Sequence, residues 1–173
     1  MKKNTLILLA LFAFLATNLY AQDPVKRPEN VGIGDFDSFK NTSFDSQDES
    51  IKLNKDVNKL DQEIKGYAGV LSTISVPKLK TDLEALRGIH KSQKALREKL
   101  GSLDEQGKTL VSKAKDVTPK LKVPQATGNT NKSIKALEAT RKNLDGVTGL
   151  ITSNSKLLID ELKKRGEKVE VFD

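Results

Sequence analysis

The chain contains no cysteine and no tryptophan among its 173 residues, and only 5% of its residues are aromatic. The absence of thiols excludes disulfide bonds, thiol catalysis, cysteine-type zinc sites, iron–sulfur clusters and covalent haem attachment. Packing alone must therefore stabilise the fold. The single histidine, His90, lies near the edge of an apolar stripe, which favours a structural edge residue with a polar tip over a metal ligand.

Long apolar runs are also scarce, and the longest covers residues 6–16 near the N-terminus. Lys2 and Lys3 precede this run, and a more polar stretch after it ends at Ala21, a pattern typical of a cleaved secretory signal peptide over residues 1–21. The run is too short to span a hydrocarbon core of ~30 Å. An uncleaved anchor remains the alternative, because Leu19 is a poor residue three positions before the cleavage point. We expect export to a bacterial periplasm or secretion, with no transmembrane segment after cleavage.

Positive charge is unevenly distributed along the chain. The whole sequence has 30 Lys and Arg against 23 Asp and Glu, and residues 78–122 hold 12 basic against 6 acidic side chains. A basic surface of this kind attracts acidic partners, although a solvated helix face is the simpler interpretation. Because residues 78–122 contain no aromatic side chain, we expect no nucleic-acid partner. The candidate interaction cations in this region are Lys91, Lys94, Arg97, Lys108, Lys113 and Lys115.

An irregular segment is expected over residues 22–45. Its first half is rich in proline and glycine, which argues against a regular element there. Its second half carries Phe36, Phe39 and Phe44, which are three of the four phenylalanines beyond residue 21. These rings have two interpretations: they cover an apolar surface of the fold, which we favour, or they form a docking motif for a partner.

Apolar residues at helical spacing predict three long helices over residues 46–166. The first begins near Ser46, which has the capping-box spacing with Glu49, and runs toward Pro77. The second follows Pro77 with a stripe of leucines and becomes two helices if it breaks near Gly101, so a four-helix count stays open. The last runs from about Asn131 to Arg165, followed by a short tail over residues 167–173. The fold class is therefore all-α, an elongated antiparallel bundle with the irregular N-terminal segment packed on one end.

Helix lengths of about 45, 60 and 50 Å leave the middle helix overhanging the first by roughly 20 Å. The segment with the three phenylalanines emerges at that same end, so we expect it to cover the overhang.

Catalytic, cofactor-binding and metal-binding residues are not expected. The carboxylates of Asp104 and Glu105 are neighbours in sequence and point about 100° apart on a helix. Asp35 and Asp37 lack the later oxygen ligands of a calcium loop. We therefore expect an exported, non-catalytic bundle with a structural or protein-interaction role, whose partner is another envelope or secreted protein or an acidic surface. A periplasmic chaperone or carrier of apolar clients or lipid is the alternative, and a homo-oligomer is compatible with either.

Overall fold

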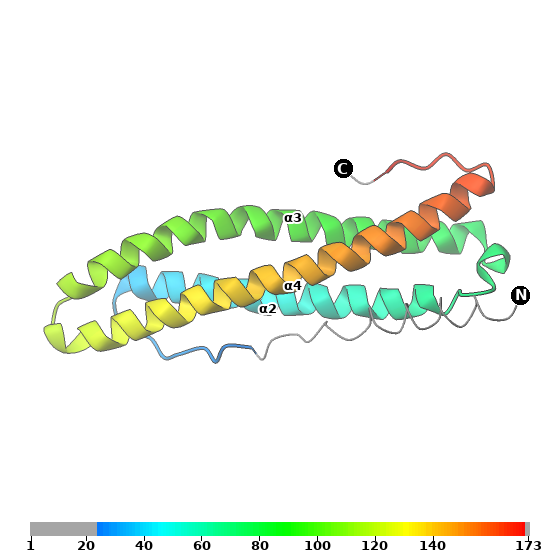
Figure 1. Cartoon of the computed structure of the whole chain (residues 1–173). Helices are drawn as coiled ribbons and strands as arrows, with labels where there is room; N and C mark the ends of the chain where they lie inside the picture. The colour runs from blue at the N-terminus through cyan, green and yellow to red at the C-terminus, as the bar shows by residue number, and fades with distance from the viewer. Residues whose placement is uncertain (1–23, 172–173) are drawn as a thin grey trace, which may run out of the picture.

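The computed structural model describes residues 24–171, so the expected signal peptide over residues 1–21 lies outside the described part. Three long helices make up this part, with short 3₁₀ helices in the connections between them. Consecutive long helices run antiparallel along the length of an elongated bundle, so the first and the third run in the same direction, and each packs against the other two (Figure 1). No strand occurs between residues 24 and 171. The predicted all-α bundle is confirmed, with α2 at Gly34–Lys65, α3 at Val76–Lys113, α4 at Val123–Lys164, η1 at Leu71–Thr73, η2 at Ala114–Asp116 and η3 at Lys120–Lys122.

The first helix, α2, begins at Gly34 rather than near Ser46, so the prediction of an irregular segment through residue 45 is wrong. Ser46 is not a cap; it is fully buried inside the helix, and its hydroxyl donates to the carbonyl of Thr42 at 2.8 Å. The prediction failed because the buried stripe of α2 contains serines at positions where leucine is expected. Its members are spaced alternately three and four residues apart, and this spacing extends back to the start of the helix. Its members are Phe36, Phe39, Ser43, Ser46, Ser50, Leu53, Val57, Leu60 and Ile64.

Residues 24–33 form the irregular part of the N-terminal segment, called here the N-terminal strap. The strap packs on the end of the bundle as predicted: the Asn129 side chain donates to the carbonyl of Glu29 at 2.6 Å, and the Gln125 side chain donates to that of Asn30 at 3.2 Å. The strap therefore ties the chain preceding α2 to the start of α4.

The far end of α2 is also shorter than the apolar spacing predicts, because the helix ends at Lys65 instead of continuing toward Pro77. Gly66 follows directly, and Gly69 adopts a φ of 79°, a left-handed conformation that favours glycine. Leu71, which continues the apolar spacing, is in a separate 3₁₀ turn and only half-buried.

The second helix, α3, is continuous through Gly101, so the count is three long helices. A Cβ placed on Gly101 would meet no atom within 4 Å, whereas one placed on Gly107, farther along α3, would lie 3.0 Å from Cζ of Phe39. The prediction of one long helix is confirmed.

The last helix, α4, begins at Val123, about two turns before the predicted start near Asn131. Pro124 falls in the first helical turn, where its missing N–H costs no hydrogen bond. At the other end, Gly166 has a φ of 83°, and the N–H of Glu167 donates to the carbonyl of Leu162 at 3.0 Å. Gly166 thus occupies the C′ position that the sequence predicts.

The interior combines a leucine core with a polar seam between α2 and α4. On α3 the buried positions are mostly leucine, whereas the buried positions of α2 and α4 include many small and amide side chains beside their apolar ones. The Asn143 amide donates to the hydroxyl of Ser50 at 3.1 Å, and the Asn154 amide donates to the carboxylate of Asp61 at 3.0 Å. Hydrogen bonding offsets much of the cost of burying these groups.

None of the helices in the described part of the chain combines the length and apolar character needed to cross a membrane.

Candidate functional site

The three phenylalanines of the N-terminal region are buried. Phe36, Phe39 and Phe44 lie in the first turns of α2, and Phe39 is 0% exposed. The ring of Phe39 lies against Gly107 of α3, at a point that Ile134 of α4 also approaches, so it packs where the three helices meet. The expected burial of the three rings is observed, and Phe39 packs against α3 as expected. They are core residues in the isolated chain and offer no surface to a partner.

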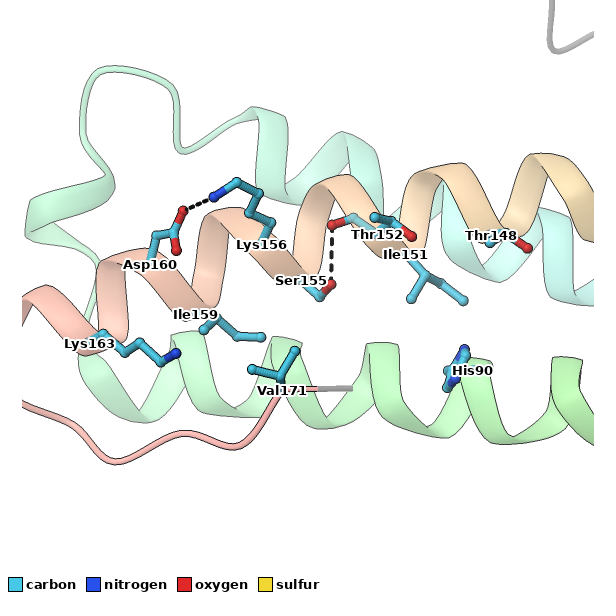
Figure 2. Close-up of a pocket in the computed structure, with 10 residues that line it drawn as sticks. All are labelled: His90, Thr148, Ile151, Thr152, Ser155, Lys156, Ile159, Asp160, Lys163 and Val171. Atoms are coloured by element: carbon cyan, nitrogen blue, oxygen red, sulfur yellow. Dashed lines mark hydrogen bonds and ion pairs between the residues drawn. The ribbon is translucent and has the colours of Figure 1, made fainter. Parts of the chain in front are cut away.

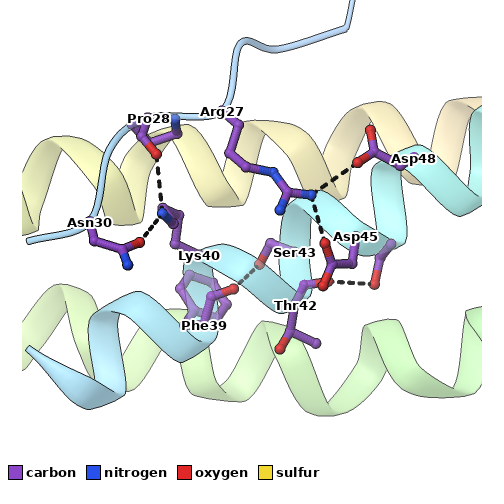
Figure 3. A network of polar contacts seen from close by, with 10 residues as sticks. Arg27, Pro28, Asn30, Phe39, Lys40, Thr42, Ser43, Asp45 and Asp48 are labelled. Atoms are coloured by element: carbon purple, nitrogen blue, oxygen red, sulfur yellow. Dashed lines mark hydrogen bonds and ion pairs between the residues drawn. The ribbon is translucent and has the colours of Figure 1, made fainter.

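A buried lysine, which the sequence does not single out, anchors the N-terminal strap beside these rings (Figure 3). Lys40 is only 3% exposed, and its ammonium group donates to the carbonyl of Pro28 at 3.1 Å and to the side-chain oxygen of Asn30. The Asp37 carboxylate accepts backbone N–H bonds from residues 31–33 at 2.7, 2.8 and 3.1 Å. Two charged side chains of α2, the Lys40 ammonium and the Asp37 carboxylate, therefore hold the strap in place.

Arg27 fixes the outer part of the strap. Its guanidinium donates to Asp45 at 2.6 Å and to Asp48 at 2.9 Å (Figure 3). It also lies 5.7 Å from the centre of the Phe44 ring. The sequence signal for this contact is an acidic pair three residues apart, which places both carboxylates on one face of α2. These contacts account for several acidic residues of the N-terminal region as structural partners.

The six candidate cations lie in the middle of α3, at its C-terminal end and, for Lys115, in the following η2 turn, and all six are exposed. Arg97 pairs with Asp145 of α4 at 2.7 Å, and Lys108 pairs with Glu105 at 2.7 Å. The remaining four form no ion pair with any residue between 24 and 171, and they are Lys91, Lys94, Lys113 and Lys115. The structure therefore divides the predicted set into paired cations and cations available to a partner.

A groove between α3 and α4, called here the α3–α4 groove, has a mainly apolar lining (Figure 2). It measures about 390 Å³ and is lined by Ile151 and Ile159 of α4, by the half-buried His90 of α3 and by Val171 of the C-terminal tail. Three polar groups of its α4 wall are engaged within the chain: Lys156 pairs with Asp160 at 2.6 Å, and the Ser155 hydroxyl donates to a backbone carbonyl. The groove thus offers a mainly apolar surface.

A charged network closes the end of the bundle where α2 connects to α3. The Tyr67 hydroxyl donates to Asp82 at 2.6 Å, and Lys78 bridges Asp82 and Glu63. Burial and the Asp82 carboxylate raise the pKa of Tyr67, and the carboxylates of Asp82 and Glu63 raise the pKa of Lys78. Arg165 donates to two carbonyls of the α2–α3 connection, so this network fastens the connection to the end of α4.

Among residues 24–171, no cluster of three histidine or carboxylate side chains is arranged to hold a metal ion. Comparisons of the chain with protein-family models, with curated proteins and with solved structures found no match. The function must therefore be inferred from the chain's own residues and their geometry.

Proposed function

We propose that the chain is an exported, non-catalytic helical bundle with a structural or protein-interaction role, and that it docks the acidic face of another envelope or secreted protein. The observation that carries this proposal is the pair Lys91 and Lys94 on the outward face of α3. Both are exposed and form no ion pair within the described range. Residues three apart on a helix share a face, so the two ammonium groups present one local positive field.

The closed interior supports a partner that binds on the outside of the bundle. Large side chains from all three helices are fully buried, including Phe39, Leu86 and Leu144. Opening the bundle would expose this surface at a cost of about 25 cal/mol for each Å² of apolar area. Docking on the exposed face of α3 requires no such opening. Export is supported by the signal-peptide pattern of residues 1–21.

The test is capture of partners from the envelope fraction of the producing cells on immobilised protein that begins at residue 22. The double variant Lys91→Glu/Lys94→Glu should lose the captured proteins, because reversing two charges repels an acidic face. The matched control is Lys55→Glu/Lys59→Glu, which changes two exposed lysines on α2 that form no ion pair with a described residue. If the Lys91/Lys94 variant captures the same proteins as the Lys55/Lys59 control does, the proposal is contradicted.

The α3–α4 groove favours a second candidate function, that of a chaperone or carrier for apolar clients or lipid. Its volume and its apolar lining by Ile151, Ile159 and Val171 are in the range of small-ligand sites. A carrier should enhance the fluorescence of a dye that binds apolar surfaces, and a fatty acid should displace that dye. Val171→Asp should then abolish dye binding, whereas Val111→Asp, an exposed position on α3, should not. Dye fluorescence at the level of free dye would contradict the carrier function.

A further inference from the structure

The turn between α3 and α4, residues 113–122, is called here the basic tip, and it presents an unusually exposed leucine. Leu121 is 91% exposed, whereas the other exposed large apolar side chains of the described chain lie between 42% and 65%. The basic tip is the extreme end of the elongated bundle, opposite the α2–α3 connection (Figure 1). A leucine at a protruding end contributes nothing to the core that lies behind it.

The turn is held from the inside, which keeps Leu121 directed away from the bundle. Ala114 and Val117 of the same turn are buried in the apolar core, and the Lys120 ammonium donates to the carbonyl of Lys115 at 2.9 Å. The N–H of Lys122 donates to the carbonyl of Pro119 at 2.9 Å. Leu121 is thus presented by an ordered turn.

Positive charge surrounds this leucine. The basic tip contains Lys113, Lys115, Lys120 and Lys122 against one acidic residue, Asp116. None of these four lysines forms an ion pair with a residue between 24 and 171. The acidic first turn of α2 begins set back from the tip (Figure 1), and its Asp37 carboxylate is already bonded to backbone N–H groups of the strap.

We propose that the basic tip docks the bundle end-on onto an anionic lipid bilayer. Lysines at such a surface lie at the level of the lipid phosphates, and an adjoining apolar side chain enters the boundary with the acyl chains. The tip supplies both groups in this arrangement, with Leu121 beside the exposed Lys113, Lys115 and Lys120 of the same turn. A bilayer also accommodates a convex end, whereas a protein partner would need a matching pocket. This contact lies at the end of the molecule, and it goes beyond the proposed docking on the outward face of α3.

Vesicle co-sedimentation tests this proposal with protein that begins at residue 22, which includes the whole described fold. The protein should bind vesicles of mixed phosphatidylglycerol and phosphatidylcholine at low salt, and binding to phosphatidylcholine alone should be much weaker. Leu121→Ser should weaken partitioning about tenfold or more, and Lys113→Gln/Lys115→Gln should weaken it roughly fivefold per lysine. The matched controls, Val70→Ser at the opposite end and Lys55→Gln/Lys59→Gln on α2, should bind as the unmodified protein does.

The absence of tryptophan allows a direct measurement of insertion at the tip. Leu121→Trp should give tryptophan emission that shifts to shorter wavelength on adding anionic vesicles, while Val70→Trp should give unshifted emission. Failure to bind anionic vesicles at low salt would overturn the proposal, as would unshifted emission from Leu121→Trp. If the tip variants instead lose a captured envelope protein while vesicles are not bound, the partner is an acidic protein and the lipid assignment is wrong. Loss of capture by the Lys91/Lys94 variant is a separate readout, so either proposal can fail alone.

Discussion

Replacing Phe39 by alanine measures how much the early part of α2 contributes to the bundle. The ring is 0% exposed and lies against Gly107 of α3, which Ile134 of α4 also approaches. Truncation of a buried phenylalanine costs about 3–5 kcal/mol, from lost transfer free energy and from the cavity left behind. For a chain of this size the melting temperature should fall by roughly 10 °C.

Thermal and urea unfolding, followed by helical circular dichroism, provide the assay. The control is Leu121→Ala, which removes a leucine that is almost fully solvent-exposed and should change the free energy of unfolding by less than about 0.5 kcal/mol. A loss below about 1 kcal/mol for Phe39→Ala would refute the packing of this segment against α3 and α4.

Gly107 supplies a second test of the same contact, because its effect should depend on Phe39. Gly107→Ala gains about 1 kcal/mol in helix propensity, but its methyl group would lie 3.0 Å from the Phe39 ring. In the Phe39→Ala background the ring is gone, so the same substitution should be more favourable there than in the unmodified protein. A double-mutant cycle with no coupling energy would show that the two residues do not touch.

Three further predictions concern polar contacts. Lys40→Met leaves the carbonyl of Pro28 without its buried donor, so unfolding should become easier by about 1–3 kcal/mol and proteolysis within the strap should become faster, whereas the exposed Lys52→Met should change neither. Ser50→Ala removes the acceptor of the buried Asn143 amide and should lower the urea midpoint by an amount equivalent to ~1 kcal/mol, and an unchanged midpoint would place this amide in contact with water. The raised pKa of Tyr67 means that the folded state binds its proton more tightly, so stability that is complete below the ordinary tyrosine pKa near 10 should be lost as pH rises through the folded value. The difference in urea midpoint between the unmodified protein and Tyr67→Phe should therefore be smaller above pH 10 than at pH 8. A difference that stays constant with pH would contradict the link between the Tyr67 pKa and stability.

The class of the fold follows from the sequence because strict helical spacing of leucines leaves little choice of architecture. The start of α2 does not follow, because its buried stripe continues through Ser43, Ser46 and Ser50, and serine at those positions resembles a cap or a loop. These serines are accommodated by hydrogen bonds to the helix backbone and by close approach to α4, which are tertiary effects. The sequence does not predict the early start of α4 either, because Pro124 and Gly128 are typical of a loop. In the structure Pro124 lies in the first turn of α4, where a helix tolerates proline, and Gly128 lies within the helix.

The candidate surfaces were predictable only in part. Composition identifies α3 as basic, but the pairing of Arg97 with Asp145 joins residues from different helices, and no spacing rule within one helix reveals it. The sequence also does not predict the exposure of Leu121, because this residue continues the apolar stripe of α3 at near-heptad spacing and would be expected to be buried. In the structure α3 has already ended at Lys113, so the stripe points into solvent at this position.

Amide hydrogen exchange across α2 tests the central claim most directly, namely that the chain is a closed bundle that binds partners on its outside. Part of the contact between α2 and α4 is made by buried serine and asparagine side chains, so α2 is the helix whose exchange is most informative. A closed bundle predicts that amides of residues 39–60 exchange as slowly as those of residues 86–110 in α3, through global unfolding alone. Exchange of α2 as a unit, at a free energy well below that of α3, would contradict the closed bundle and favour a carrier that opens to admit apolar clients.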